Sequence, residues 1–331
     1  MVKGYIPWVS ARATQSSQLA AAIERCTAQI LAWQEEGGLR GPGPIFAGIG
    51  NSLAAAGAAV WRLRERGIES WRAGAGDYPV PFPPSAHPVI GISQSGRSAE
   101  TLAVLSSVPS RQRLAVVNVG DSPIALLASR SVLLGDIPDS YASTIGYTAT
   151  VAALGLVADA WDGGRADPGW ASLPVVSEDL HDVVGGLGAD AAYADVVAAA
   201  PSLGSAECGA LLLREVARLP STPMSTRSYL HGAMESAGSG WHIVLGDGRE
   251  TQLAHTLAGS GRRVLLVTTA PASPAPNLWT VRIPDVPAGQ RAVLEALVLQ
   301  SLAEAAAALR GVAIEEFVFH HDDTKVAIPG A

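Results

Sequence analysis

The sequence has 331 residues, of which 48% are hydrophobic and only 16% are charged, so it can bury a large core and is long enough for two domains. This composition excludes a disordered chain. A net charge of -7 without a basic stripe argues against nucleic acid as a partner, because such binding depends on Lys and Arg that neutralise phosphates. Abundant Ala, Gly and Val favour an α/β protein with buried parallel strands.

The cysteines and the apolar segments indicate the cellular compartment of the protein. Cys26 and Cys208 match no metal spacing and are too few for a disulfide framework, which favours buried thiols in a reducing compartment. Residues 1–20 lack the apolar core of a signal peptide, and the long apolar stretch 293–309 contains two Glu and one Gln. We therefore expect a cytoplasmic protein that does not bind membranes.

The first half of the sequence alternates helical and strand patterns. Apolar residues recur at helical spacing over residues 16–36, and a Gly-Gly pair ends this pattern. The elements expected next are a strand at 44–49, a helix at 52–66, a strand at 89–92, a helix at 99–105, a strand at 114–119 and a helix at 144–161. This β-α-β alternation predicts a parallel, doubly wound sheet.

The second half repeats this plan. Its expected elements are strands at 195–200, 241–245, 264–268 and 279–283, followed by a closing helix at 290–309. Residues 202–215 match residues 52–65 at positions that include Ser52/Ser202, Leu53/Leu203 and the run 63–65/213–215, and both segments follow an expected strand, so we expect two copies of one α/β unit. The resulting division is an N-terminal helical segment (1–36), a first domain (37–162), a linker (163–174), a second domain (175–311) and a C-terminal tail (312–331).

A hydroxyl-rich turn lies between an expected strand and an expected helix. Its sequence at residues 91–101 is GISQSGRSAET, with Ser93, Ser95 and Ser98 around a glycine. Free backbone N–H groups at the helix start, together with these hydroxyls, can surround a phosphate without using a positive charge. Helix capping by Ser98 alone would account for one serine but not for three. The turn therefore predicts an anion site.

The turn also carries a family resemblance. Residues 93–101, following the loop at 50–52, resemble the signature of the tandem sugar isomerase (SIS) domain family, which includes the isomerase half of glucosamine-6-phosphate synthase. The resemblance implies an α/β fold of two tandem SIS domains, each a parallel-sheet αβα sandwich of flavodoxin-like type. It implies a sugar-phosphate site made by Gly50, Asn51, Ser52, Ser93, Gln94, Ser95, Ser98, Ser143 and Thr144. The family usually has Lys after the last pair, where this chain has Ile145.

The same resemblance implies three catalytic residues. Glu215 matches the family's proton-abstracting Glu, His231 matches its ring-opening His, and Lys325 matches the Lys that reaches the sugar near carbon 1. A carboxylate can move a proton between carbons 2 and 1, a His can open the sugar ring, and an amine can stabilise the enediolate or form an imine. Lys325 is also one of only two lysines in the chain. The alternative is that Glu215 is a solvated helix residue, like Glu65 in the first copy, and that His231 is a loop residue.

Other features argue against a metal or a second phosphate site. The run HHDD at residues 320–323 is more typical of a polar turn than of a metal site, because no partner ligands stand at a suitable spacing. The second copy of the phosphate loop, residues 246–251, has no serines, so we expect one phosphate site per chain. The chain also has Ser228 and Ala233 where the family often has Glu and Pro. We expect no cofactor.

The expected function is that of a phosphosugar aldose-ketose isomerase or an amino-sugar phosphate deaminase or deglycase, acting at carbons 1 and 2 of a sugar 6-phosphate. Val2 stands where glutamine-hydrolysing relatives have Cys, so release of ammonia from glutamine in that way is not expected. The alternatives are a non-catalytic sugar-phosphate sensor and a structural protein with an empty site. Against the sensor count the lack of a basic helix-turn-helix pattern and the competent side chains at all three catalytic positions, and the intact serine loop argues against an empty site. The resemblance further implies a homodimer in which His231 could serve the neighbouring chain's site.

Overall fold

The computed structural model describes residues 5–178, 191–315, 317–319, 321 and 323–327. The chain forms two compact units. The first unit combines Met1–Pro174 with Val318–Ala331, and the second is Val175–Phe317. The first unit is therefore made of two separate stretches of chain, and the second unit lies between them in the sequence.

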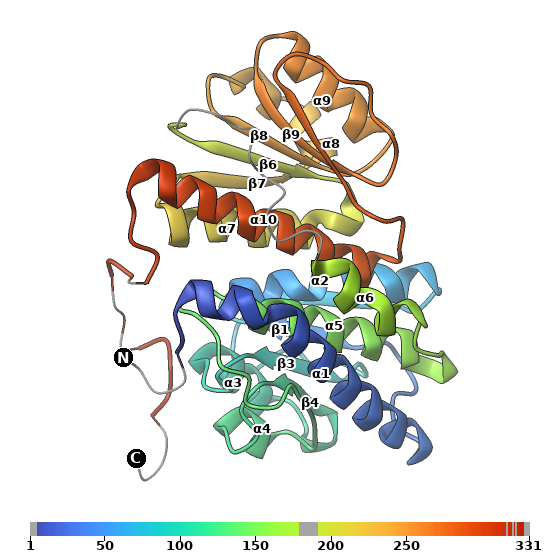
Figure 1. Cartoon of the computed structure of the whole chain (residues 1–331). Coiled ribbons are helices and arrows are strands. Elements are labelled where there is room, and N and C mark those ends of the chain that lie inside the picture. Colours follow the sequence, from blue (N-terminus) through green and yellow to red (C-terminus); the bar gives the residue numbers. More distant parts are fainter. Residues whose placement is uncertain (1–4, 179–190, 316, 320, 322, 328–331) are drawn as a thin grey trace. The chain divides into compact units, whose positions relative to one another are not determined.

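The first unit is a parallel sheet with helices on both faces (Figure 1). Its strands, in the spatial order β2-β1-β3-β4-β5, are β1 (Ile45–Gly48), β2 (Trp71–Gly74), β3 (Val89–Ser93), β4 (Arg113–Val117) and β5 (Arg130–Leu133). Its helices are α1 (Trp8–Glu35), α2 (Asn51–Glu65), α3 (Ala99–Ser107), α4 (Pro123–Leu127), α5 (Ile145–Ala160) and α6 (Gly169–Glu178), the last of which continues into the second unit. Helices α1 and α2 pack on α5 at one face of the sheet, and α3 and α4 lie on the other.

Helix α5 is the core helix of the first unit. Every one of its residues from Ile145 to Ala160 is buried, because its sequence is apolar or small on all sides. The opposite face of the sheet is filled by side chains such as Val89, Leu105 and Val117, which form one buried cluster with α3 and α4. Packing on both faces holds the sheet in place, and α3 and α5 begin at its carboxyl edge.

The second unit repeats this architecture, as predicted. Its strands, in the spatial order β10-β9-β8-β6-β7, are β6 (Ala194–Ala198), β7 (Ser221–Ser225), β8 (Trp241–Leu245), β9 (Arg263–Thr268) and β10 (Leu278–Arg282), and all pairings are parallel. Its helices are α7 (Leu203–Ala217), α8 (Thr226–Leu230), α9 (Arg249–Gly259) and α10 (Ala288–Arg310). Strands β6 to β10 thus take the places that β1 to β5 take in the first sheet.

The helices of the second unit also lie on two faces of their sheet. Helices α7 and α10 pack against each other on one face (Figure 1). Helices α8 and α9 share a buried cluster on the other face, which includes Tyr229 and Leu253 of the helices and Val197 and Val244 of the strands. Side chains of α7 and α10 are therefore separated by the sheet from those of α8 and α9 within this unit.

Two elements differ from the sequence-based expectation. Helix α1 begins at Trp8, directly after Pro7, and is a full two turns longer than the expected helix at 16–36. Residues 163–174, expected to form a linker, contain the start of α6. Its Trp170 is 3% exposed and donates a hydrogen bond from Nε1 to Asp159 of α5 at 2.9 Å, so this stretch packs on the first unit.

Helix α10 is the one helix of the described chain that is long and apolar enough to span a membrane. Of its most apolar window, 78% is buried inside the structure. A buried core helix meets the same criteria of length and composition, and α10 packs on α7.

Candidate active site

The serine loop follows β3 and leads into α3. Gly96 has a φ of +64°, and a Cβ there would lie 1.9 Å from the hydroxyl oxygen of Ser122, so only glycine fits this turn. The hydroxyls of Ser93 and Ser98 are 3.0 Å apart and hydrogen bonded, and the hydroxyl of Ser95 accepts the backbone N–H of Arg97 at 3.3 Å. The loop therefore gathers its three serines in one turn at the carboxyl edge of the first sheet.

The alternative reading of Ser98 as a simple helix cap does not match the geometry. Ser98 occupies the N-cap position of α3, but its side chain caps no backbone N–H group. The backbone N–H of Ala99 instead donates to the carbonyl of Thr324 in the C-terminal tail at 3.2 Å. One N–H group that the sequence suggested would be free for an anion is thus already hydrogen bonded to the tail.

Asp139 organises the second part of the site, and the sequence analysis missed it. Its carboxylate accepts the side-chain amide of Gln94 at 3.1 Å, the hydroxyl of Ser143 at 2.9 Å and the hydroxyl of Thr144 at 2.5 Å. It also accepts the backbone N–H of Gly146 at 2.9 Å, and a Cβ at Gly146 would lie 2.0 Å from the Gln94 amide nitrogen. Asp139, 3% exposed, therefore joins the serine loop to the start of α5.

The loop at residues 50–52 follows β1, which pairs with β3 in the sheet. The strand order reverses between these two strands, and the crevice at such a point is where open α/β sheets bind ligands. Gly50 has a φ of +56°, and the side-chain oxygen of Asn51 is buried without a hydrogen-bond partner within the described residues. An unpaired buried acceptor is costly, so a donor from a ligand would stabilise it. Ser52 stands in the first turn of α2, half-buried.

Lys325 lies against the serine loop. It forms an isolated antiparallel bridge with Ser98, although the two residues are 227 positions apart in the sequence. The Lys325 side chain is exposed, and its ammonium group has no hydrogen bond or ion pair with any described residue. The first unit therefore brings together the predicted phosphate loop and the predicted amine.

Glu215 differs clearly from its counterpart in the first unit. Glu65 is exposed and accepts a hydrogen bond from Trp61 Nε1 at 2.7 Å. Glu215, near the end of α7, is half-buried, and its carboxylate has no hydrogen bond or ion pair to the part of the chain that is described. Burial raises the pKa of Glu215 to about 7. A carboxylate with a pKa near neutrality is poised for proton transfer, whereas a solvated surface carboxylate is not.

His231 is exposed and lies directly after α8, where its backbone N–H donates to the carbonyl of Arg227 at 3.1 Å. Because α7 and α8 cover opposite faces of the second sheet, the sheet itself separates Glu215 from His231. One copy of the second unit does not bring these two side chains together.

A buried polar cluster supports α8, and it too was missed from the sequence. Tyr229 donates its hydroxyl to Asp195 at 3.3 Å and lies 3.2 Å from His242 Nδ1. His242 is fully buried, and Asp195 is 7% exposed. Burial, followed by the charge of Asp195, raises the pKa of Tyr229 above its ordinary value. The cluster anchors the helix that carries His231 to β6 and β8.

The serine-free loop of the second unit is filled by the protein's own carboxylate. Asp247 accepts the Thr268 hydroxyl at 2.5 Å, the Thr269 backbone N–H at 2.8 Å and Arg291 Nη1 at 2.5 Å. Although burial acts in the opposite direction, these hydrogen bonds hold the pKa of Asp247 well below its ordinary value. Arg291 also donates to the buried Glu295 at 2.8 Å. The Thr268 hydroxyl, the Thr269 N–H and Arg291 Nη1 are thus already bonded to Asp247.

No cluster of His, Cys, Asp or Glu suited to a metal occurs within the described residues. His320 and Asp322 of the HHDD run lie outside the described residues, so the structure does not test that turn.

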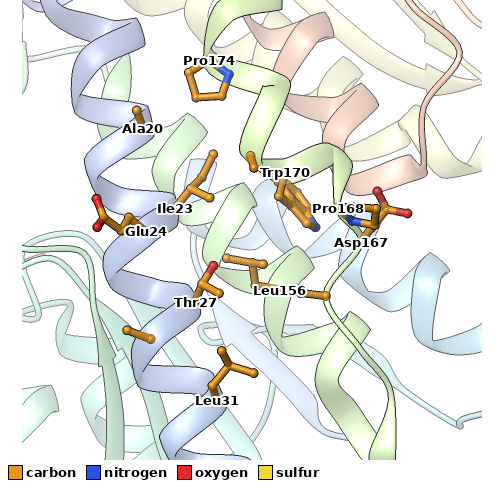
Figure 2. Close-up of a pocket in the computed structure, with 13 residues that line it drawn as sticks. Ala20, Ile23, Glu24, Thr27, Leu31, Leu156, Asp167, Pro168, Trp170 and Pro174 are labelled. Atoms are coloured by element: carbon orange, nitrogen blue, oxygen red, sulfur yellow. The ribbon is translucent and has the colours of Figure 1, made fainter.

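One cavity of the first unit lies away from this site. It has a volume of about 530 Å³ and is walled by α1, the second half of α5 and the start of α6 (Figure 2). Its lining is mainly apolar, with Ile23, Leu31, Leu156 and Trp170 prominent. Leu156 stands near the end of α5, whereas the serine loop and Asp139 are at its beginning. The cavity is therefore separate from the candidate site.

The sequence matches no family model and no curated protein. Among solved structures, the chain is similar to the C-terminal domain of glucosamine-fructose-6-phosphate aminotransferase from Francisella tularensis, with a TM-score of 0.77, 16% identity, and coverage of 96% of this chain and 99% of that one. It is similar to tagatose-6-phosphate ketose/aldose isomerase from Escherichia coli, with a TM-score of 0.76, 16% identity, and coverage of 94% and 96%. It is also similar to glucosamine-6-phosphate deaminase from Thermotoga maritima, with a TM-score of 0.75, 17% identity, and coverage of 96% and 99%. At these identities the likeness establishes the fold, and the resemblance predicted from the serine loop is confirmed at that level.

Proposed function

We propose that this chain, which shares its fold with sugar-phosphate isomerases and a deaminase, binds a sugar 6-phosphate and moves a proton between its carbons 1 and 2. The activity is that of an aldose-ketose isomerase or an amino-sugar phosphate deaminase. The observation that carries the proposal is the pairing of Lys325 with Ser98. These two residues come from distant motifs: Lys325 was expected to supply an amine, and Ser98 was expected to bind the phosphate. In the first unit they lie opposite each other.

The serine loop would hold the phosphate. Ser93, Ser95 and Ser98 offer hydroxyls at the carboxyl edge of the first sheet, and the Gln94 amide is fixed in direction by Asp139. Hydroxyls and oriented amides stabilise an anion through hydrogen bonds without needing a cation. The sugar would then extend toward Ser143 and Asn51, whose unpaired side-chain oxygen is a ready acceptor for a sugar hydroxyl.

Glu215 would act as the general base. With its pKa at about 7, the carboxylate is half ionised near neutral pH and is a stronger base than an ordinary Glu. Its lack of an ion pair to any described residue leaves the oxygens available to a substrate C–H group. Lys325 would contribute the amine that stabilises the developing enediolate or forms an imine with the open carbonyl.

His231 would serve the site of a second copy of the chain. Glu215 and His231 lie on opposite faces of one sheet, so a site that uses both residues requires two chains. We therefore propose a homodimer whose sites each take His231 from the partner subunit.

Two further points complete the proposal. The strand order 2-1-3-4-5 in both sheets supports a flavodoxin-like type for each unit. The two free, buried cysteines support a cytoplasmic location, where thiols stay reduced.

Calorimetry with a panel of hexose and hexosamine 6-phosphates and their unphosphorylated counterparts tests the phosphate site. We expect binding of one or more phosphosugars and far weaker binding of the free sugars. Ser95→Ala should weaken phosphosugar binding by about tenfold or more, as loss of a hydrogen bond to a charged group does. Ser106→Ala is the matched control, because Ser106 is exposed on α3 and its hydroxyl donates to the carbonyl of Leu102 in its own helix. Equal affinity for phosphorylated and free sugars would refute the assignment.

Proton exchange tests the catalytic assignment. Incubation of a bound phosphosugar in D₂O, followed by NMR, should show loss of the carbon 2 proton. Glu215→Gln should keep binding but slow this exchange on the order of 100-fold or more, since an amide cannot act as a base. Tight phosphosugar binding without exchange or product in the wild-type protein would favour the sensor function instead.

A further inference from the structure

The C-terminal tail is attached to the serine loop by backbone and side-chain hydrogen bonds. The backbone N–H of Ala99 donates to the carbonyl of Thr324 at 3.2 Å, and the backbone N–H of Val326 donates to the carbonyl of Arg97 at 3.0 Å. These bonds flank the bridge between Ser98 and Lys325. The tail thus runs as a short antiparallel strand along the start of α3.

This hydrogen-bond pattern fixes where the amine emerges. Ser98 and Lys325 are a non-hydrogen-bonded pair, since the bonds come from the residues on either side of them. In such pairs the two Cα atoms are roughly 4.5 Å apart and the side chains leave the same face of the ladder. Lys325 therefore projects on the side of the Ser98 hydroxyl, which itself bonds to Ser93.

Arg97 adds a side-chain bond to this attachment. Its guanidinium Nε donates to the carbonyl of Val326 at 2.7 Å. Its own backbone is fixed, because its N–H donates to Ser95 and the preceding residue, Gly96, accepts the N–H of Ile124 at 3.0 Å. The guanidinium therefore reaches from a rigid turn to the residue next to Lys325.

The direction of this guanidinium has a functional meaning. An Arg inside a phosphate-binding loop is ordinarily expected to bind the phosphate, since its planar fork matches an anion. Here its Nε donates to a tail carbonyl, and the other side chains of the loop offer the hydroxyls of Ser93, Ser95 and Ser98 and the amide of Gln94. The Arg97 guanidinium therefore bonds to the tail through its Nε–H group.

We propose that Arg97 is a positioning residue that fastens the C-terminal tail to the serine loop, so that Lys325 is presented to the sugar, and that it is not a ligand of the phosphate. The inference rests on the proposed function for its catalytic part only. The attachment of the tail can be measured without any substrate.

Arg97→Gln removes the charge-assisted bond and leaves the backbone pairing. A hydrogen bond from a charged group is worth roughly ten- to a hundredfold in an equilibrium, so the tail should detach more often by that factor. Hydrogen exchange of the Val326 and Ala99 amides should accelerate accordingly in the ligand-free protein. Arg111→Gln is the matched control, because Arg111 is an exposed Arg of the same unit outside the tail contact, and its exchange pattern should equal that of the wild type.

Kinetics with the phosphosugar that the wild type turns over should then separate positioning from phosphate binding. We expect kcat of Arg97→Gln to fall about tenfold or more while KM changes little. Val326→Pro, which removes the N–H that bonds to Arg97 but leaves Arg97 intact, should show the same split. This second variant keeps the test valid if Arg97→Gln is unstable.

The outcomes separate the two hypotheses. Unchanged exchange at Val326 and Ala99 in Arg97→Gln would overturn the attachment role. Accelerated exchange with a large rise in KM and an unchanged kcat would show that Arg97 binds the phosphate, and would overturn the second half of the proposal. If the wild type binds no phosphosugar, the proposed function fails together with the catalytic part of this inference, and the exchange result still decides whether Arg97 fastens the tail.

Discussion

Replacement of Glu215 by Gln should make the protein more stable at pH 8 than the wild type and have a much smaller effect at pH 5. Burial raises the pKa of this carboxyl from its ordinary value of 4.5 to about 7 in the folded protein. Between these two values the folded state holds a proton that the unfolded state has released, so stability falls as the pH rises through this window. The loss is complete above pH 7, where both states are ionised and the folded state carries a poorly solvated charge.

The size of the effect follows from the same values. At about 1.4 kcal/mol for each pKa unit, the interval from 4.5 to about 7 corresponds to at most about 3.5 kcal/mol at pH 8. Because the carboxylate is partly exposed, we expect about 1 to 2 kcal/mol. In a unit of this size each kcal/mol shifts the Tm by roughly 2 to 4 °C, so Glu215→Gln should raise the Tm by roughly 2 to 8 °C at pH 8.

Thermal unfolding followed by circular dichroism at pH 5, 6, 7 and 8 measures this difference. Glu65→Gln is the control, since it removes the same charge at the matching position of the first unit, where the carboxylate is exposed and accepts a hydrogen bond from Trp61. Its Tm difference from the wild type should not change with pH. If the Tm difference between Glu215→Gln and the wild type is equally independent of pH, Glu215 is an ordinary helix residue, and the argument for a general base fails.

Three further perturbations test the rest of the site. Mixing Glu215→Gln chains with His231→Asn chains under conditions that exchange subunits should restore part of the activity that each variant lacks, because one site of each mixed dimer has both native residues. If a demonstrated mixed dimer recovers no activity, the two-chain site is contradicted. Asp139→Asn should lower the free energy of unfolding by about 2 to 3 kcal/mol and weaken phosphosugar binding, since one carboxylate oxygen becomes an amide group that cannot accept from Gln94 or Ser143. Chemical denaturation measures the stability and calorimetry measures the binding, and a fully stable variant with native affinity would show that Asp139 does not organise the site. Lys325→Arg should bind phosphosugar but lose most turnover in a coupled assay, because a guanidinium stays protonated, whereas full activity would reduce Lys325 to an electrostatic role.

Central elements of the fold could be predicted from the sequence, and three edge strands could not. Strands such as β3 and β8 are buried at every position and appear as apolar runs. Strands β2, β5 and β7 stand at sheet edges with few buried residues, and β7 contains Pro223, which only an edge position tolerates. In these three strands no apolar run marks the strand in the sequence, whereas the edge strand β10 was predicted.

The candidate site was predictable where its residues are contiguous. Ser93, Ser95 and Ser98 form one motif, so a single turn reveals them. Asp139 was not predictable, because its role depends on donors that converge only after folding. The separation of Glu215 from His231 was equally hidden, since a spacing along the chain does not say on which face of the sheet each following helix packs.

The discontinuity of the first unit affects the order in which a nascent chain acquires its parts. Residues up to Pro174 contain every strand of the first sheet and the serine loop, and they leave the ribosome long before the tail does. The bond between Arg97 and Val326 spans 229 positions, with the whole second unit between its partners. During synthesis, the hydroxyl loop can therefore form early, and the amine of Lys325 arrives last. A chain that stalls or is cut before Thr324 would keep the folded serine loop without Lys325, the residue that we propose completes the site, so folding assays alone would not detect the loss.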